Sequence, residues 1–291
     1  MGEAKGRVAV VTGASSGIGK EAAKALAAEG WHVIAHGRDA GRSAEAKAEI
    51  EAAAAHGGRV DMVRADLSLL SDTARMADDI AVLTDRVDVL LNNAGGLRDR
   101  QEITAEGNEV TFAGNHLGHF LLTGRLLPLL RKAAADGKPG DVRIINVSSR
   151  GHANCPGIDW DDLQMLNDWT TVGAYERVKL CNVLFTRALA KRLGGEGIVS
   201  HAMHPGVVAS NFAAHGSPQL QAHMSASPEL ITASEGADTL IWLAMADEPG
   251  KANGRYYKER TDSPASPLAD DEALSERLWV ESEALVRKAG Y

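Results

Sequence analysis

Short apolar runs alternate with longer amphipathic segments along most of this 291-residue chain. Continuous runs of Val, Ile and Leu are typical of strands covered on both faces, and the segments between them have a helical period. The expected strands are 8–11, 32–35, 60–63, 87–91, 142–147 and 198–203. The expected helices are 18–29, 44–55, 71–84, 103–132 and 171–193. This alternation predicts an α/β fold, a doubly wound Rossmann-type domain with a central parallel sheet and helices on both faces.

The length of the chain allows two domains, but no repeat or low-complexity linker divides it, so we expect a single domain over residues 1–291. Two irregular stretches, 151–170 and 206–228, interrupt the rhythm. Long loops often cover a functional site, although either stretch is also compatible with a plain surface excursion. We expect the second to be a lid, and we expect a C-terminal helical tail, 268–289, near the substrate site. The apolar residues of this tail are Leu274, Leu278, Trp279, Leu285 and Val286.

The charge balance and the cysteines exclude several kinds of protein. The chain has 31 basic and 39 acidic residues, a net charge of −8, whereas a nucleic-acid binder has a basic face. Cys155 and Cys181 form neither a disulfide framework nor a four-cysteine zinc site, and no His or Cys cluster has the spacing of metal ligands. We see no secretory signal and no apolar window of about 18 residues. We therefore expect a cytoplasmic protein without a metal or a membrane span.

A glycine-rich turn follows the first expected strand and leads directly into a helix. Glycines in this position permit a tight turn and let backbone N–H groups approach a pyrophosphate, and the helix N-terminus favours the negative charge. The turn lacks the Gly-Lys-Ser/Thr ending of a Walker loop. The candidate cofactor residues in the turn are Gly13, Ser15, Ser16, Gly17, Ile18 and Gly19.

The end of the second expected strand bears on the choice of cofactor. An acid there would bind the adenosine ribose 2′-hydroxyl and select NAD, but this sequence has Gly37 followed by Arg38. Because a guanidinium binds a 2′-phosphate well, we expect NADP, with NAD still possible. Asp39 either neutralises Arg38 or caps the next helix. Asp66, which ends the third strand, either accepts from the adenine amino group or is a turn residue.

Several motifs, in this order, resemble the short-chain dehydrogenase/reductase family over about residues 7–210. The residues that carry the resemblance are Thr12–Gly19, Asp66-Leu67, Asn92-Asn93-Ala94-Gly95, the set Asn115, Ser149, Tyr175 and Lys179, and His204-Pro205-Gly206-Val207-Val208 with Ser210 in place of the usual Thr. The resemblance implies that Asp66 and Leu67 contact adenine and that Asn93, Ala94 and Gly95 lie beside the adenosine ribose. It also implies that Pro205, Gly206, Val208 and Ser210 lie near the nicotinamide.

The four residues Asn115, Ser149, Tyr175 and Lys179 stand where this family has its catalytic tetrad. Tyr175 and Lys179 share one face of a helix, and a nearby ammonium lowers the pKa of a tyrosine, so we expect Tyr175 to act as general acid or base. Ser149 is chosen over Ser148 because the family pattern Asn-Val-Ser-Ser has the active serine second. The resemblance gives Lys179 a second contact with the nicotinamide ribose, and Asn115 a proton relay.

The closer likeness is to the retinol-dehydrogenase-like branch, through segments 115–120, 143–149 and 159–163. It implies hydrophobic alcohol or carbonyl substrates. The loop 151–170 is expected to wall the substrate pocket, with Trp160, Met165, Leu166 and Trp169 as its bulky residues.

The function expected from these features is that of an NADP(H)-dependent carbonyl reductase or alcohol dehydrogenase. The alternatives are an NAD-dependent alcohol dehydrogenase of the same family and a catalytically idle nucleotide-binding sensor or scaffold. Such an idle protein needs no Tyr175. We expect a homo-oligomer, with a monomer left open.

Overall fold

The computed structural model describes residues 6–209 and 217–291, and its centre is an eight-stranded sheet with the strand order β10-β9-β6-β5-β4-β1-β2-β3. Neighbouring strands are parallel except for β10, which pairs antiparallel with β9. The predicted parallel α/β sheet is therefore confirmed. The strands are β1 (Val8–Val11), β2 (His32–Gly37), β3 (Arg59–Arg64), β4 (Val89–Asn92), β5 (Val142–Val147), β6 (Ile198–His204), β9 (Tyr256–Lys258) and β10 (Thr261–Asp262).

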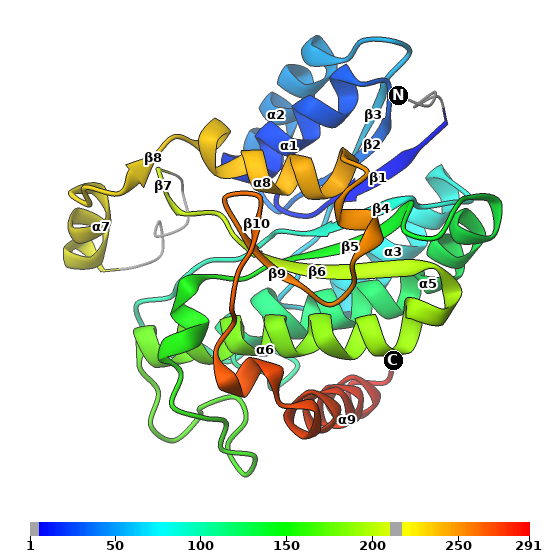
Figure 1. Cartoon of the computed structure of the whole chain (residues 1–291). Helices are drawn as coiled ribbons and strands as arrows, with labels where there is room; N and C mark the ends of the chain where they lie inside the picture. The colour runs from blue at the N-terminus through cyan, green and yellow to red at the C-terminus, as the bar shows by residue number, and fades with distance from the viewer. Residues whose placement is uncertain (1–5, 210–216) are drawn as a thin grey trace.

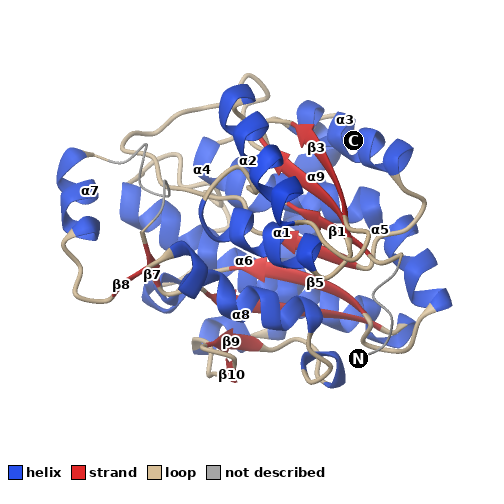
Figure 2. Ribbon diagram, turned by 90° about the horizontal axis from the view of Figure 1, so that it is seen from above, coloured by secondary structure: helices blue, strands red, loops and turns tan. Residues whose placement is uncertain are grey.

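Helices cover both faces of this sheet (Figures 1 and 2). Helices α1, α2 and α8 lie on one face, and α3, α5 and α6 lie on the other, with α9 outside α6. The helices are α1 (Gly17–Ala28), α2 (Ala40–Ala53), α3 (Leu70–Leu83), α4 (Val110–Phe112), α5 (Gly118–Asp136), α6 (Thr171–Leu193), α7 (Pro218–Ser225), α8 (Ala233–Met245) and α9 (Glu272–Lys288).

Strand β5 illustrates why the strands are apolar at every position. All six of its residues are buried, and successive side chains point to opposite faces of the sheet. Ile144 therefore packs in the core with α5 and α6, whereas Ile145 packs in the core with α1 and α8. A strand between two helical layers has no solvent face, which explains the continuous apolar runs.

The helix predicted over 103–132 is wrong at its beginning. Residues 103–109 form a loop with a bridge between Ile103 and Glu109, and helical structure begins only at Val110. The reason is local: Gly107 has a positive φ of +82°, and the Glu109 carboxylate caps the helix by accepting from the Phe112 N–H. A π-helical turn, Ala113–Leu117, then connects α4 to α5.

Several elements after residue 205 had no counterpart among the expected strands and helices. Helix α8 begins with a capping box formed by Thr232 and Glu235, and β9 extends the sheet beside β6. A two-stranded sheet, β7 (Val207–Val208) with β8 (Leu230–Ile231), flanks helix α7. The expected lid lies partly here, but residues 210–216 fall outside the described residues. A short strand such as β9 depends on its neighbour β6 for pairing, which a local pattern does not reveal.

The tail forms helix α9, which packs along α6 (Figure 1). Leu278 is buried, and the Trp279 ring contacts Phe120 and Phe185 at centroid distances of 4.9 and 6.0 Å. The Arg192 guanidinium lies 4.1 Å from the Trp279 ring centroid. These contacts exist because α9 has one apolar side that α5 and α6 bury. Any influence of the tail on substrate choice stays a prediction.

Two negative observations apply to residues 6–209 and 217–291 alone. Among them, no helix combines the length and the apolar character that a membrane span needs. The same residues contain no group of three or more His, Cys, Asp or Glu side chains placed to hold a metal ion.

Candidate functional site

A cavity of about 520 Å³ opens at the carboxyl ends of the parallel strands, where open α/β sheets bind their ligands. Its lining includes every predicted site residue in the described part of the chain. The cofactor group comprises Gly13, Ser15, Ser16, Gly17, Ile18, Gly19, Arg38, Asp66, Leu67, Asn93, Ala94, Gly95, Pro205, Gly206 and Val208. The catalytic group comprises Asn115, Ser149, Tyr175 and Lys179. Ser210 lies outside the described residues. One cavity thus joins both groups.

The glycine turn is packed tightly against the Asn-Asn-Ala-Gly motif that follows β4. A Cβ atom on Gly13 would lie 2.8 Å from the Ala94 Cα atom, and one on Gly19 would overlap the side-chain amide of Asn93. The Thr12 hydroxyl accepts from the backbone N–H groups of Asn93 and Ala94 at 2.8 and 2.9 Å. The Asn93 amide donates to the Thr12 carbonyl at 2.7 Å. The turn therefore has one shape, and side chains larger than glycine do not fit.

The beginning of α1 fits a pyrophosphate. Ser16, the N-cap, has extended backbone and its side chain makes no capping bond in the described structure, and the first turn of α1 contains no acid. Orphan N–H groups and the positive end of the helix dipole therefore remain for an anion. The absence of a competing carboxylate and the glycine cradle together match what a dinucleotide requires.

His36 lines the cavity beside the glycine turn, although no sequence motif indicated it. Its Nδ1 atom accepts from the Gly13 N–H at 3.2 Å, and its Nε2 atom lies 3.1 Å from the Ala65 carbonyl, so the proton is on Nε2. Its carbonyl accepts from the Ala14 N–H at 2.7 Å. Burial lowers the pKa of this imidazole, which keeps it neutral. The sequence signal that could have identified this residue is a histidine within the otherwise apolar strand β2.

The end of β2 is crowded at the position where an acid would select NAD. A Cβ atom on Gly37 would overlap the buried Ser43 hydroxyl and lie 2.9 Å from the Ser15 Cβ atom. Arg38 lines the cavity beside it and lies 3.4 Å from the Asp66 carboxylate. Of the two interpretations of Asp39, capping is the one observed, because its carboxylate accepts from the Arg42 N–H at 2.9 Å at the beginning of α2.

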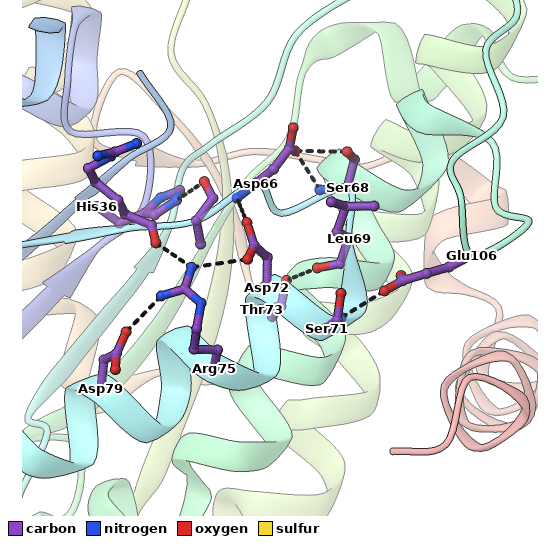
Figure 3. A network of polar contacts seen from close by, with 12 residues as sticks. His36, Asp66, Ser68, Leu69, Ser71, Asp72, Thr73, Arg75, Asp79 and Glu106 are labelled. Atoms are coloured by element: carbon purple, nitrogen blue, oxygen red, sulfur yellow. Dashed lines mark hydrogen bonds and ion pairs between the residues drawn. The ribbon is translucent and has the colours of Figure 1, made fainter. Parts of the chain in front are cut away.

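Asp66 is both a turn residue and a cavity residue (Figure 3). Its carboxylate accepts from the Ser68 N–H at 3.0 Å and from the Ser68 hydroxyl at 2.7 Å, and its own N–H is held by Asp72 at 2.9 Å. Burial opposes ionisation, but the bonds from Ser68 and the Arg38 charge outweigh it and lower the pKa of Asp66. The carboxylate is thus ionised and fixed in place, able to accept a further hydrogen bond.

Tyr175 and Lys179 lie one turn apart on α6, as expected, and Ser149 follows β5. The Ser149 hydroxyl is hydrogen-bonded to the Tyr175 hydroxyl and accepts from the Gly151 N–H at 3.1 Å. The Lys179 Nζ atom lies 5.5 Å from the centroid of the Tyr175 ring. These three side chains come from two elements that the sheet places side by side.

The expected lowering of the tyrosine pKa is not observed in this structure. Burial raises the pKa of Tyr175 to about 12, and the Ser149 hydrogen bond offsets only part of this. Burial also lowers the pKa of Lys179 to about 8. Loss of water disfavours the charged form of both groups, and burial is the largest cause of both pKa shifts. At neutral pH Tyr175 therefore keeps its proton.

Ser148 and Ser149 point to different places. The Ser148 hydroxyl donates to the Lys179 carbonyl at 2.8 Å and thereby ties β5 to α6, whereas Ser149 bonds Tyr175 in the cavity. Lys179 donates to the Val147 carbonyl at 3.2 Å. The geometry thus assigns a connecting role to Ser148 and leaves Ser149 beside the tyrosine.

Asn115 sits in the π-helical turn, a feature that often marks functional sites. Its amide donates to the Gly96 and Thr111 carbonyls at 3.1 and 2.9 Å, and its oxygen accepts from the Gly96 N–H at 3.2 Å. A Cβ atom on Gly95 would overlap the Asn115 oxygen and lie 3.4 Å from Lys179 Nζ. Asn115 therefore fixes the loop beside Lys179, while its role in a proton relay stays a prediction.

The bulky residues of loop 151–170 do not line the cavity in the described structure. The Trp169 indole N–H donates to Glu109 at 3.2 Å, and the Trp160 ring lies 4.7 Å from the Arg277 guanidinium of α9. Met165 and Leu166 are likewise absent from the described lining. The wall instead includes Gly151, Asn154, Leu97, Val110 and Val172. The loop turns its aromatic rings toward Glu109 and α9, which provide polar partners.

Comparisons with known proteins place these features in a family. The model of the short chain dehydrogenase family matches residues 7–161. Retinol dehydrogenase 12 of Homo sapiens is 38% identical over 274 residues, covering 94% of this chain and 84% of that protein. Retinol dehydrogenase 13 of Homo sapiens is 36% identical, covering 97% and 85%.

Solved structures agree with the sequence relatives. An uncharacterized protein from Mycobacterium paratuberculosis has a TM-score of 0.76 at 30% identity and covers 97% of this chain and 94% of its own. The Pseudomonas aeruginosa RhlG/NADP active-site complex has a TM-score of 0.69 at 28% identity, covering 93% and 97%. The family model matches more than half of the chain, and the retinol dehydrogenases match nearly all of it. The protein therefore belongs to the short-chain dehydrogenase family, in its retinol-dehydrogenase-like branch.

Proposed function

We propose that this protein is an NADP(H)-dependent oxidoreductase that interconverts a hydrophobic carbonyl compound and its alcohol. Membership of the short-chain dehydrogenase family makes it an oxidoreductase acting on alcohol or carbonyl groups. The observation that carries the finer proposal is the single cavity that joins the glycine turn to Ser149, Tyr175 and Lys179.

The protonation state of Tyr175 is the one that reduction of a carbonyl group requires. A buried tyrosine with its pKa raised to about 12 holds its proton at neutral pH, so it can give that proton to a carbonyl oxygen. The bound nicotinamide supplies or accepts the hydride at the carbon atom. Ser149 holds the same oxygen by a hydrogen bond and stabilises its developing charge. In the oxidising direction, Tyr175 takes the proton back from the alcohol.

The Lys179 ammonium contributes to this proton transfer by electrostatics. Its buried charge, 5.5 Å from the Tyr175 ring centroid, stabilises a phenolate as the proton leaves. It is also placed to donate to a ribose hydroxyl of the cofactor, since it lies beside Gly95 in the cavity wall. The substrate's apolar part would contact the side chains of Leu97, Val110 and Val172.

The preference for NADP is supported by the end of β2. A Cβ atom at Gly37 would overlap the Ser43 hydroxyl, and Arg38 lines the cavity beside it. A guanidinium binds a phosphate with charge-assisted hydrogen bonds. The relative RhlG was solved as an NADP complex. An NAD-dependent alcohol dehydrogenase is the alternative, since Asp66 partly neutralises Arg38.

The test of the function is turnover with a panel of carbonyl compounds. The protein is mixed with NADPH and with aliphatic aldehydes, retinal-like aldehydes, steroids and cyclic ketones, and the loss of reduced cofactor is followed by absorbance. We expect turnover of at least one hydrophobic carbonyl. A protein that binds NADPH but reduces none of these compounds would instead be a nucleotide-binding sensor or scaffold.

The cofactor preference is tested by Arg38→Ala. We expect the affinity for NADPH to fall about 10-fold to 100-fold, because a charge-assisted bond is lost, while the affinity for NADH stays unchanged. Fluorescence titration of both cofactors measures the ratio. The matched control is Arg59→Ala, at the first residue of β3, where the side chain is 60% exposed and pairs with Asp61. An unchanged NADPH/NADH ratio in Arg38→Ala would remove Arg38 from cofactor selection.

A further inference from the structure

The cavity is basic although the chain as a whole is acidic. Its described lining contains five cationic side chains, Arg38, Arg42, Arg98, Arg150 and Lys179, against the two carboxylates of Asp66 and Glu176. The chain's net charge is −8. A concave site of one sign concentrates ligands of the opposite sign. The cavity is therefore suited to anions, of which the phosphates of the cofactor are one kind.

Four of the five cations have a partner within the protein. Arg38 pairs with Asp66 at 3.4 Å, and Arg42 pairs with Asp39 at 3.6 Å. Arg150 pairs with Glu229 at 2.6 Å, and Lys179 donates to the Val147 carbonyl at 3.2 Å.

Arg98 differs from these four cations because no partner for its side chain is found among the described residues. It is half-buried in the wall of the cavity, yet within residues 6–209 and 217–291 it makes no hydrogen bond, ion pair or ring contact. Its neighbours along the chain, Asp99 and Arg100, are exposed and do not line the cavity. A guanidinium has five N–H donors in a fixed fork. This fork is thus available to a ligand in the cavity.

The position of Arg98 is on the catalytic side of the cavity. Just before it, Gly96 is held by two hydrogen bonds to Asn115, at 3.1 and 3.2 Å. Just after it, the Gln101 amide donates to the Leu166 carbonyl at 2.8 Å, in loop 151–170. Arg98 therefore belongs to a segment that is held on one side by Asn115 of the π-helical turn and on the other side by loop 151–170. The residues expected to hold the adenosine and the pyrophosphate lie elsewhere, at Gly37–Arg38 and at the beginning of α1.

We propose that Arg98 is a specificity-determining residue that binds a carboxylate on the substrate. The substrate would then be an apolar carbonyl compound or alcohol with a carboxylate remote from the reacting carbon. Leu97 and Val172 contact its apolar part, and Arg98 forms a bidentate pair with the carboxylate. This inference rests on the proposed function and narrows its substrate class.

The test compares three aldehydes of equal chain length with NADPH as cofactor. They are an aliphatic aldehyde, the ω-oxo carboxylate and its methyl ester, each over a series of chain lengths. We expect kcat/KM for the carboxylate to exceed that for the ester by about 10-fold to 100-fold at the best length, as for a charge-assisted bond. In Arg98→Gln this advantage should vanish, while turnover of the aliphatic aldehyde and the affinity for NADPH stay unchanged.

Two further variants and one binding measurement complete the test. Arg98→Lys should keep part of the carboxylate preference, and the control Arg100→Gln, at an exposed arginine paired with Glu102, should keep all of it. Binding of an unreactive alkanoate to the NADPH complex is measured beside its methyl ester. Absence of an Arg98-dependent preference for the carboxylate overturns the inference, as does a loss of NADPH affinity in Arg98→Gln. A wild-type protein that reduces no aldehyde refutes the proposed function, while the alkanoate titration still decides the role of Arg98.

Discussion

At the cofactor end of the cavity the chain has glycines where side chains would not fit, whereas at the catalytic end it buries polar side chains. Gly13, Gly19 and Gly37 leave no room for a Cβ atom, and their backbone and the beginning of α1 form the surface that an anion meets. At the catalytic end, the working atoms are side-chain groups of Tyr175 and Lys179, each held in place by burial.

This difference predicts opposite sensitivities. At the cofactor end the glycines are closely packed, so adding a single carbon atom should weaken cofactor binding and leave the catalytic step unchanged. The catalytic end depends on particular polar atoms, so removing a single oxygen atom should slow the catalytic step and leave cofactor affinity unchanged. Three substitution experiments follow from this contrast.

The largest effect is expected at Tyr175→Phe. The change removes the only proton donor that the proposed mechanism uses, and general acid catalysis contributes about 10²-fold to 10⁴-fold. Steady-state kinetics should show kcat reduced by that factor, and fluorescence titration should show NADPH affinity unchanged. Tyr256→Phe is the matched control, since Tyr256 is buried against the His152 ring at 4.7 Å but does not line the cavity. Equal losses in both variants would contradict a special role for Tyr175.

A smaller effect is expected when a methyl group is added at Gly19. The new Cβ atom would overlap the Asn93 amide and lie 2.6 Å from the Gly13 carbonyl oxygen, so the turn must shift. Overpacking of this kind costs about 1–3 kcal/mol, and we expect NADPH affinity to fall about 10-fold to 100-fold. The control is Gly124→Ala in α5, where a Cβ atom meets nothing within 4 Å and helix propensity should stabilise the fold by about 0.5–1 kcal/mol. Undiminished NADPH binding by Gly19→Ala would show that the turn has spare room.

The smallest effect is the dependence of the unfolding free energy on pH, and we expect histidines at both ends of the cavity to contribute to it. His119 bonds the Thr12 hydroxyl at 2.9 Å behind the glycine turn, and His204 lines the catalytic end. Burial lowers their pKa values to about 3 and about 4. Because the unfolded chain takes up protons first as pH falls, their contribution to stability is complete above pH 6.5 and is lost below it, down to the folded pKa values.

Each of these two histidines should cost about 1.4 kcal/mol of unfolding free energy per pH unit below 6.5. Urea unfolding at pH 7.5 and at about pH 5.5 measures this loss, and it should shrink by about 1.4 kcal/mol in His119→Gln and in His204→Gln. The exposed His56 provides the control, since His56→Gln should leave the pH dependence unchanged. A pH dependence that persists in full in His119→Gln would show that this histidine is not held neutral by the fold.

Much of the fold could be predicted because its signals are local. The runs 8–11 and 142–147 and the helix 171–193 have the predicted bounds, since strand burial and helix periodicity are written in consecutive residues. The beginning of the helix after β4 was wrong because the capping by Glu109 competes with periodicity. Helix α8 and strand β9 were missed, since β9 is stabilised by pairing with β6 and not by its own pattern.

The amino-acid sequence by itself determined the parallel α/β architecture, the glycine turn and the set of polar residues now found around one cavity, because these depend on short spacings along the chain. Only the tertiary structure decided that His36 holds the glycine turn, that α9 packs on α6, and that burial raises the pKa of Tyr175. It alone also distinguished Arg98 from the paired cations beside it. These properties depend on which distant residues exclude water from one another or neutralise one another's charge, and that is settled only when the chain folds.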